Sequence, residues 1–558
     1  MEYRLAHNCL KVRNLHNSLQ FYTEILHMQE KGRVHIGDTI LVYLGDEKAS
    51  VHELELNYHP DHADAYQLGE NPVHLAFAVD DYQEALEAHR QAGCIKLEVP
   101  QHGIHFLADP DGYLIEILPQ KHFSLTERGY NMRINEAQLK SIIDELTLDK
   151  EQLKEVASAM RFDMELALQG RESSMPMLCS YIGMPTGQEK GEFLALDFGG
   201  TNLRAELVSL KGDCQYEIVK MVAKPLVTEE YNLINGSASA EKVFDFIADM
   251  FAELLEGAEN KTYYLGHTFS FPSQQTDIYN ARLLVWTKEF AIPGVEGEVV
   301  NDLLQAAFDR KGLSNIKVVA VINDTVAELL TAGYQYPDTQ IGCIYATGSN
   351  NCYMERTADV GRPAAIINME SGSFNKLAPS QWDNKLDEAS EKPGRQRLEK
   401  MVSGRYMGEL LSLTVQHLLN LQEKPEFTAI DMSGIMADTT AVASDAAKVI
   451  SAKVGALEPG EAAYIRDLTE AIAIRSARIV AACFAGILWH VSGSGKIADQ
   501  HIAIDGSVYE HMPHIKENVQ KALYEILDEE AGAVTPMLLK DGSGLGAAIA
   551  AAVASKNI

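Results

Sequence analysis

Four residues near the start of the chain place two imidazoles and two carboxylates at matching positions of an approximate internal repeat. The segments HNCLKVRNLHNSLQFYTEILHMQ, from His7, and HLAFAVDDYQEALEAHRQAGC, from His74, each have the pattern of a strand, a turn and an amphipathic helix. Each is followed by strands that end in a glutamate, because VHELELNY contains Glu55 and YLIEIL contains Glu116. The repeat predicts a βαβββ module that is used twice.

The chemistry that suits these four side chains is the binding of a divalent metal ion. Alternate residues of a strand face the same side, so Glu116 shares its face with Leu114 and Leu118, and the opposite face is also apolar. Burying an unpaired carboxylate in such a strand is costly, so a partner is expected. Two imidazoles and two carboxylates suit Zn²⁺ or Ni²⁺, with water in the remaining positions. We therefore predict that the two histidines and two glutamates of the repeat form a metal site.

The other histidines of this region have no counterpart in the repeat. A histidine on a strand is more often a core or edge residue than a ligand, and only the repeat-equivalent placement of the four favours metal binding. We expect the remaining histidines to lie on the surface or to line a pocket: His52, His59, His102 and His105.

The segments that carry these residues resemble the glyoxalase I family (lactoylglutathione lyase) of the vicinal-oxygen-chelate superfamily: HNCLKV…SLQFYTEILHM, ELELNY, VHLAFAVDD and DPDGYLIEIL. The resemblance implies metal binding by His7, Glu55, His74 and Glu116. It also implies isomerisation of the hemithioacetal of methylglyoxal and a low-molecular-weight thiol, such as glutathione, to an S-lactoyl thioester. A base moves a proton between adjacent carbons while the metal stabilises an enediolate, and Glu116 is the first candidate for that base and Glu55 the second.

The sequence departs from this family where glutathione should bind. Lys11 stands where the family usually has Arg on the first strand, His59 stands where it has Asn, and VPQHGIHF replaces a lysine-bearing loop. The identity of the thiol therefore stays open, as does an epimerase reaction on another substrate with an acidic proton. A noncatalytic module that senses a metal or metabolite, or that dimerises the chain, is a third hypothesis.

A second group of polar residues lies in LALDFGGTNLRAELVSL, where Asp197 and two glycines separate two apolar strands. Backbone N–H groups of such a turn can approach phosphates, and Asp197 can hold hydrated Mg²⁺. The sequence contains no G-x-x-x-x-G-K-[ST] motif, which argues against a P-loop enzyme. Too few residues follow GSGLGA at 542–547 for a dinucleotide-binding βαβ unit, so we assign this segment to a nucleotide pocket.

Eight later motifs resemble, in their order and spacing, the eukaryotic-type hexokinase/glucokinase family: LGHTFSFPSQQ, LVWTKEF, VVAVINDTVAELL, IGCIYATGSNNCYME, INMESGSF, PGRQRLEKMVSGRYMGELL, AIDGSVYEHMP and LKDGSGLGAAIAAAV. The resemblance implies a two-lobed actin-like ATPase (ribonuclease H-like) fold. It also implies phosphoryl transfer from ATP, with Mg²⁺, to the 6-hydroxyl of glucose or another hexose.

The hexokinase resemblance assigns roles residue by residue. Asp324 is the expected base for the 6-hydroxyl. The sugar would be held by Ser270, Thr287, Lys288, Asn323, Asp324, Asn350, Glu370 and Glu399. The first phosphate turn would comprise Asp197, Gly199, Gly200, Thr201, Asn202 and Arg204, and the second Thr347, Gly348 and Ser349. Gly506, Ser507, Gly542 and Ser543 would lie near the adenosine. Ser371 stands where the family usually has Trp, and TKEF replaces TKGF, so the preferred hexose stays open.

The whole chain is predicted to be a multidomain protein of the α/β and α+β classes. Residues 1–120 form the metal-binding domain of paired βαβββ modules, which is the vicinal-oxygen-chelate fold, and residues 121–134 form a linker. Residues 135–558 form the hexokinase domain, with a small lobe mainly at about 190–325 and a large lobe at about 326–558 plus the N-terminal helices.

Composition restricts the partners and the compartment. A net charge of −31 argues against general binding to nucleic acid or an anionic membrane. Seven scattered cysteines without a C-x-x-C pair favour a reducing cytoplasm, and no signal peptide is apparent. The longest apolar run, IVAACFAGILW at 479–489, is too short to cross a membrane and predicts a buried helix. We expect small-molecule partners only, namely glucose, ATP and the methylglyoxal–thiol adduct, and a homodimer formed through the N-terminal domain.

Overall fold

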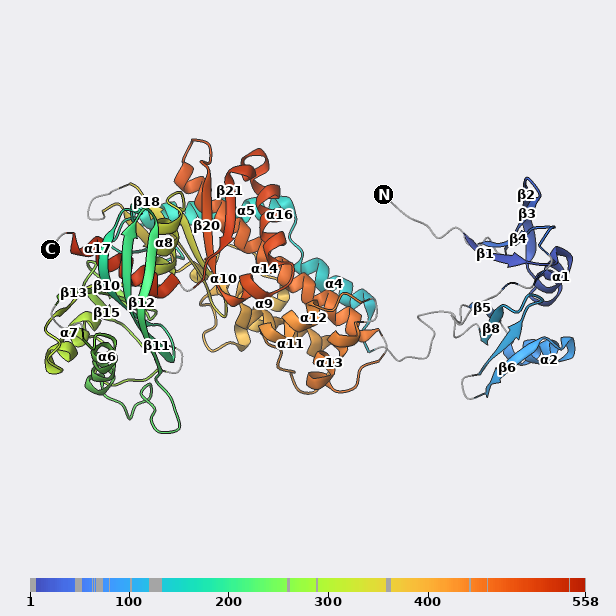
Figure 1. The fold of residues 1–558 in the computed structure, drawn as a ribbon, viewed down its shortest axis with the longest axis horizontal. Helices are drawn as coiled ribbons and strands as arrows, with labels where there is room; N and C mark the ends of the chain where they lie inside the picture. Colours follow the sequence, from blue (N-terminus) through green and yellow to red (C-terminus); the bar gives the residue numbers. More distant parts are fainter. Residues whose placement is uncertain are drawn as a thin grey trace. The chain divides into compact units, whose positions relative to one another are not determined.

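The computed structural model describes residues 7–45, 53–62, 64, 66, 74–79, 81–100, 103–119, 133–257, 261–287, 290–357, 363–440, 443–458, 460–540 and 542–556 (Figure 1). The chain divides into two compact units, residues 1–131 and 132–558. This division lies inside the segment predicted to be a linker.

The first unit contains two four-stranded sheets with equivalent strand orders. The first sheet has the order β1-β4-β3-β2, with β1 at His7–Val12, β2 at Gln29–Ile36, β3 at Thr39–Gly45 and β4 at Glu53–Tyr58. The second has the order β5-β8-β7-β6, with β5 at His74–Val79, β6 at Ile95–Val99, β7 at Ile104–Ala108 and β8 at Leu114–Pro119. A helical segment follows the first strand of each module: α1 at Leu15–Gln20 with η1 at Phe21–Ile25, and α2 at Tyr82–Ala92. The predicted βαβββ repeat is confirmed.

Local sequence signals set the ends of α2. The Asp81 side chain accepts hydrogen bonds from the backbone N–H groups of Gln83 and Glu84, which caps the first turn. Gly93 ends the helix in the left-handed conformation, with φ of 67°, where a side chain would be strained. Between these ends, Leu86 and His89 are buried.

One hydrophobic core joins the two modules of the first unit. It includes Leu54 and Leu56 from β4 and Ile115 and Ile117 from β8. Alternate residues of a strand face opposite sides, so Glu55 lies on the face of β4 that points away from this core. The same alternation places Glu116 on the outer face of β8.

Polar contacts between the modules gather at the turn DPDG. The buried Tyr22 hydroxyl donates to the Asp109 carboxylate at 3.0 Å, and the Arg13 guanidinium pairs with Asp111 at 3.1 Å. Asp109 also accepts from the backbone N–H groups of Asp111 and Tyr113. One turn of the second module is therefore attached to the α1 and η1 region of the first.

The second unit contains two large sheets. The five-stranded sheet has the order β12-β11-β10-β13-β16, with β10 at Lys190–Phe198, β11 at Asn202–Gly212, β12 at Gln215–Pro225, β13 at Tyr263–Phe269 and β16 at Ile316–Ile322. The six-stranded sheet has the order β21-β20-β17-β18-β19-β9, with β9 at Leu178–Cys179, β17 at Ile341–Tyr345, β18 at Ser349–Glu355, β19 at Ala365–Asn368, β20 at Gln500–Asp505 and β21 at Val534–Leu538. A small hairpin joins β14 at Ser273–Gln275 to β15 at Ala281–Leu283. Each large sheet is the centre of one lobe.

Helices complete the two lobes. The first lobe has α6 at Ala240–Leu254 and α7 at Val300–Arg310. The second has α4 at Glu136–Leu146, α5 at Lys150–Leu168, α9 at Gln381–Ala389, α10 at Arg397–Val402, α11 at Gly404–Leu418, α12 at Ala429–Met436, α13 at Ser444–Val454, α14 at Glu461–Ser492, α15 at Ser507–His511 and α16 at Ile515–Leu527. Short 3₁₀ turns lie at Ser371–Ser373 and Asp528–Ala533.

Two further helices, α8 at Asp324–Gln335 and α17 at Gly542–Ser555, pack against each other and share a core with strands of both sheets. We expected residues 326–558 to lie in the large lobe, but α17 packs on β10 and β13 of the five-stranded sheet. Gly266 permits this contact, because a Cβ at that position would lie 1.9 Å from the carbonyl oxygen of Ala547. The chain therefore returns to the first lobe at α17.

The helix α14 is long and apolar enough to cross a membrane by length and composition alone. In the structure 83% of its most apolar window is buried inside the protein, where it packs against α5 and α16. The run at 479–489 is part of this helix, and its residues from Val480 to Leu488 are buried. The predicted buried helix is confirmed.

Candidate functional site

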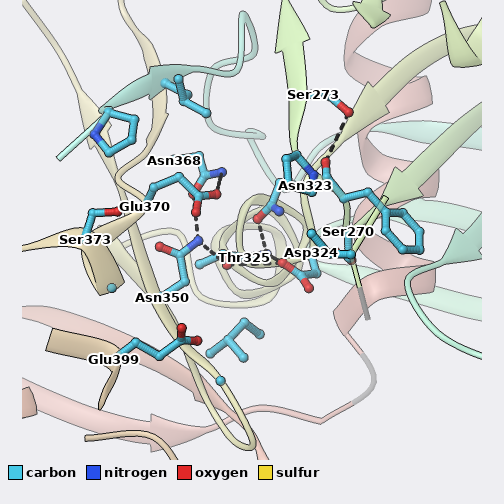
Figure 2. A pocket seen from close by; sticks show the side chains of 18 of the residues that line it. Ser270, Ser273, Asn323, Asp324, Thr325, Asn350, Asn368, Glu370, Ser373 and Glu399 are labelled. Carbon is cyan, nitrogen blue, oxygen red and sulfur yellow. Dashed lines mark hydrogen bonds between the residues drawn. The ribbon is translucent and has the colours of Figure 1, made fainter. Parts of the chain in front are cut away.

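A pocket of about 1340 Å³ is lined by both lobes of the second unit. Its lining contains most of the residues predicted to hold a sugar: Ser270, Thr287, Asn323, Asp324, Asn350, Glu370 and Glu399. Figure 2 labels all of these residues except Thr287. Lys288, the remaining member, lies outside the described residues. The fold thus gathers polar side chains from motifs that are far apart in the sequence.

Asp324 is the first residue of α8, and Asn323 alone separates it from the end of β16. Asn323 caps this helix by accepting a hydrogen bond from the Thr325 N–H at 2.9 Å. The same N–H donates to Asp324 Oδ1 at 2.8 Å. The amino end of a helix favours a negative charge, so the fold provides a suitable place for this carboxylate.

An amide network connects Asp324 to the opposite wall of the pocket (Figure 2). Asn350 Nδ2 donates to Thr325 Oγ1 at 3.1 Å and to Asn368 Oδ1 at 2.8 Å. Asn368 Nδ2 in turn donates to Glu370 Oε1 at 2.8 Å. Sequence reasoning missed Asn368 and Thr325, although both lie in quoted motifs, because only the folded chain brings β18, β19 and α8 together.

Two glutamates of the pocket, Glu370 and Glu399, are in surroundings that disfavour the charged form. Burial raises the pKa of Glu370, the Asn368 hydrogen bond opposes this effect, and the negative charges of Asp324 and Glu399 add to it. Burial also raises the pKa of Glu399, which accepts a hydrogen bond from the Ser349 N–H at 3.4 Å. Partly buried carboxylates that converge on one cavity are typical of a binding or catalytic site.

The first predicted phosphate turn joins β10 to β11. Asp197 lies next to the end of β10, and its carboxylate pairs with the Arg204 guanidinium at 3.2 Å. Gly199 allows a close approach to the pocket, because a Cβ there would lie 2.7 Å from Ser270 Oγ. The turn continues through Gly200 and Thr201 to Asn202, the first residue of β11. It is therefore in contact with one of the predicted sugar residues.

The second predicted phosphate turn joins β17 to β18, and all three of its predicted residues line the pocket: Thr347, Gly348 and Ser349. The Gly404 N–H at the start of α11 donates to the Ala346 carbonyl at 2.8 Å. A Cβ at Gly348 would lie 2.9 Å from Glu399 Oε1. This turn is consequently packed against a second predicted sugar residue.

The residues predicted to lie near adenosine are at the starts of two helices, α15 and α17. Gly506 precedes α15 with φ of 132°, and a Cβ there would lie 2.4 Å from the Tyr345 carbonyl oxygen. Ser507 begins α15, while Gly542 and Ser543 begin α17. Gly542 accepts a hydrogen bond from the Thr331 hydroxyl at 2.7 Å. The structure thus places both pairs at helix starts that pack against the pocket-forming elements.

In the first unit, strand register relates each predicted metal-binding histidine to a glutamate. Cys9 lies opposite Glu55 in the β1–β4 pair, and Ala76 lies opposite Glu116 in the β5–β8 pair. His7 and His74 each precede those residues by two positions on their own strands, β1 and β5. The side chains of both histidines lie outside the described residues, and the described side chains form no group of three potential metal ligands.

The surroundings of the two glutamates differ. Glu55 is buried, with Cys9 and Tyr43 as its cross-strand neighbours. Burial, together with the hydrogen bond and charge of Glu55, raises the pKa of the Cys9 thiol to about 11. Glu116 has Ala76 and Phe106 as cross-strand neighbours.

The expectation that His105 lies on the surface or lines a pocket is wrong. His105 is fully buried, and its Nε2 lies 2.8 Å from Nδ1 of His89 on α2. Its Nδ1 lies 3.2 Å from the Tyr82 hydroxyl. Burial, and then the proximity of His89, lowers the pKa of His105 to about 4, so this residue serves the core as a neutral hydrogen-bonding side chain. His59 is exposed, and His52 and His102 lie outside the described residues.

Comparison with known proteins agrees with both sets of motifs. Two family models described as Hexokinase match residues 138–334 and 340–553, and the model of the Glyoxalase/Bleomycin resistance protein/Dioxygenase superfamily matches residues 4–117. Hexokinase-1 of Schizosaccharomyces pombe is 33% identical over 77% of this chain and 94% of its own length. A hexokinase crystal structure has a TM-score of 0.68 and 31% identity over 75% of this chain and 99% of its own. The glucose complex of Schistosoma mansoni hexokinase has a TM-score of 0.63 and 30% identity over 75% and 98%.

Replacing Glu370 by glutamine should stabilise the second unit, and more so as the pH rises. Folding raises the pKa of this carboxyl group, so the wild type loses stability as the pH rises from the ordinary glutamate value of about 4.3 through the raised folded value. The variant has no ionisable group at position 370, so its stability does not fall with pH for this reason. Thermal unfolding between about pH 4.5 and pH 8 should therefore show a difference in Tm that grows with pH. The exposed Glu388→Gln is the control, and a Glu370→Gln variant less stable than wild type at pH 8 would contradict the argument.

Proposed function

Because this chain belongs to the hexokinase family and carries a glyoxalase-superfamily domain at residues 4–117, we propose that it is an enzyme with two activities. The second unit phosphorylates glucose and related hexoses at the 6-hydroxyl with ATP. The first unit isomerises the hemithioacetal of methylglyoxal and a small thiol to an S-lactoyl thioester. The convergence of Asp324, Glu370 and Glu399 in a pocket lined by both lobes carries the first part of the proposal.

Asp324 has the position required of a base for the sugar hydroxyl. Its Oδ1 is held by the N–H and hydroxyl of Thr325, whereas its Oδ2 has no hydrogen bond to a described residue. A hexose whose 6-hydroxyl lies within hydrogen-bonding reach of Oδ2 gives up its proton there as the oxygen attacks the terminal phosphorus of ATP. The amide network on the Thr325 side keeps the carboxylate in one orientation.

The remaining pocket residues suit a molecule with several neighbouring hydroxyl groups. Glu370 and Glu399 accept hydrogen bonds when ionised, and Asn323 and Ser270 add both donors and acceptors. A substrate that lacks a hydroxyl group would leave such a buried group unpaired, which gives the pocket its selectivity. The related hexokinase in complex with glucose supports this sugar as the first substrate to assay.

The two glycine turns suit the phosphates of ATP. Gly199 packs against Ser270 and Gly348 against Glu399, so each turn lies beside the sugar residues that the reaction must bring to the nucleotide. Backbone N–H groups at such turns bind phosphate oxygens. Asp197 would hold hydrated Mg²⁺, which neutralises charge on the phosphates when bound.

The Asp324→Ala variant should fold and bind glucose but lose hexose phosphorylation. Removal of the base should lower kcat by about 10²–10⁴-fold, measured by coupling glucose 6-phosphate formation to NADPH production. Glucose binding is measured by calorimetry without ATP, and the lactoyl thioester activity of the same preparation is the control. Residual phosphorylation within tenfold of wild type would exclude Asp324 as the base.

The imidazole nitrogens and carboxylate oxygens proposed as ligands in the first unit suit a divalent metal ion. Strand alternation would give His7 the same face as Glu55 and His74 the same face as Glu116, and the two glutamates lie on faces that point away from the hydrophobic core. His7, Glu55, His74 and Glu116 would hold Zn²⁺ or Ni²⁺. The ion, when bound, polarises the adjacent oxygens of the hemithioacetal.

We assign the proton transfer to Glu116. The resemblance to the glyoxalase I family makes Glu116 the first candidate for this role and Glu55 the second. Glu55 is buried, with Cys9 and Tyr43 as its cross-strand neighbours. Glu116 would take the proton from the carbon that bears sulfur and return it to the neighbouring carbon, which converts the hemithioacetal into the thioester.

Metal-loaded wild type should convert methylglyoxal and a thiol to an S-lactoyl thioester. Glu116→Gln should lower kcat by about 10²-fold or more, and a chelator should abolish turnover until Zn²⁺ or Ni²⁺ is restored. Glu98→Gln, on β6 of the same sheet, is the matched control, because Glu98 pairs with Arg90 at the surface. Because Lys11 and His59 differ from the family pattern, several thiols must be assayed. Metal binding without turnover on any of them would reject this activity and favour a sensor module.

The shared core of the first unit argues that its metal site is completed by a second chain. Core residues of β4 and β8 belong to one cluster, so the faces of Glu55 and Glu116 point away from that cluster. Among the described strands, β1 and β5 each form the edge of their own sheet. We therefore propose a homodimer in which His7 and Glu55 of one chain meet His74 and Glu116 of the other.

Two inactive chains test this arrangement. One carries His7→Ala with Glu55→Gln, and the other carries His74→Ala with Glu116→Gln. If sites form between chains, random exchange should restore about a quarter of wild-type lyase activity, because half of the dimers are mixed and each has one intact site. Hexose phosphorylation by the same mixture controls for folding. No recovery in dimers that have exchanged subunits, as shown by mass spectrometry, would place the site within one chain.

A further inference from the structure

A buried polar pair lies directly behind the sugar pocket. Asn351 follows Asn350 on β18, so strand alternation turns its side chain to the other side, where it is only 3% exposed. Its Nδ2 donates to Oγ of the fully buried Ser371 at 3.0 Å. Neither residue lines the pocket.

This pair holds the segment that presents Glu370. The Met369 N–H donates to the Asn351 carbonyl at 3.0 Å, and the Ser371 N–H donates to Asn350 Oδ1 at 3.2 Å. Glu370 therefore lies between two residues that are both attached to β18. The hydrogen bond from the Asn351 side chain to Ser371 is a third attachment. Together the three hydrogen bonds hold the backbone on both sides of Glu370, and this limits the directions that its side chain can take.

The backbone at Glu370 needs such support. Its φ and ψ of 52° and 45° are left-handed, which is unfavourable for a residue with a side chain. Gly372, two residues after Glu370, is in close contact with α10 and the residue that precedes it, because a Cβ there would lie 3.1 Å from Glu399 Cβ and 2.5 Å from Gln396 Oε1. The segment is thus strained at one residue and closely packed two residues later.

Electrostatics acts against this arrangement. Glu370 shares the pocket with Asp324 and Glu399, and like charges favour separation of these side chains and movement of Glu370 towards water. The attachment to β18 opposes that movement. Without it, the Glu370 carboxylate would no longer have one position relative to Asp324.

The Asn351–Ser371 pair also lowers the stability of the fold, so packing alone does not explain its presence. Asn351 Oδ1 is buried and has no hydrogen-bond partner among the described residues. A buried unsatisfied acceptor is destabilising, and two apolar residues would avoid this loss. Polar groups that reduce stability are expected where they serve a site.

We propose that Asn351 and Ser371 are positioning residues for the kinase reaction: their hydrogen bond sets the Glu370 carboxylate for the sugar and so determines affinity for the hexose. This inference rests on the proposed hexose kinase function. It assigns a role to the serine that departs from the family pattern and to an asparagine that the sequence motifs did not single out.

Ser371→Ala tests the proposal in the full-length protein. The glucose KM and the calorimetric Kd should rise about five- to twentyfold, while the KM for ATP stays within about twofold and kcat changes less than KM. The matched control is Ser412→Ala, which removes another buried serine hydroxyl of the same lobe that donates to the Gly408 carbonyl and does not line the pocket. The control should lower Tm without changing the glucose Kd.

A double-mutant cycle separates positioning from general destabilisation. Asn351→Ala should raise the glucose Kd like Ser371→Ala, and the double variant should be no weaker than either single one, since both changes remove one interaction. A glucose Kd unchanged from wild type in both single variants, or strictly additive effects in the double variant, would overturn the proposal. Wild-type protein without hexose phosphorylation would instead reject the proposed kinase function, so the two failures are distinguishable.

Discussion

The convergence of three carboxylates in one pocket is the constraint on which the catalytic unit depends. Asp324, Glu370 and Glu399 come from the start of α8, the turn after β19 and helix α10. Their charges repel one another, and burial raises the pKa of both glutamates. The site can exist because each carboxylate is held by a neighbouring donor: the Thr325 N–H for Asp324, the Asn368 amide for Glu370 and the Ser349 N–H for Glu399.

The same pocket brings two glycine turns against the residues that we propose to bind the sugar. Gly199 of the first phosphate turn approaches Ser270, and Gly348 of the second approaches Glu399. A side chain at either glycine would collide with a residue of the sugar site. Close backbone approach therefore joins the two turns proposed to bind phosphate to the residues proposed to bind the sugar, and the proposed phosphoryl transfer requires such proximity.

In the first unit, strand alternation puts the core residues of each sheet on one face and the glutamate proposed to bind metal on the other. Leu54, Leu56, Ile115 and Ile117 form the core that joins the modules, while Glu55 and Glu116 lie on the opposite faces. This explains how a carboxylate can stand in the middle of YLIEIL without disturbing the core. For the same reason, neither glutamate faces the core that the two modules share.

Strand alternation and the internal repeat were enough to predict the repeated module, because both are local properties of the chain. The resemblance of ordered motifs to the hexokinase family implied the two-lobed fold and a set of residues that line one pocket in the structure. Which of those residues touch depends on the folded chain. The role of Asn368, the hydrogen bond between Asn351 and Ser371, the burial of His105 and the return of α17 to the first lobe all arise from contacts between segments far apart in the sequence. Their physical origin is the packing of small residues such as Gly266 and the pairing of buried donors and acceptors, and neither leaves a periodic signal in the sequence.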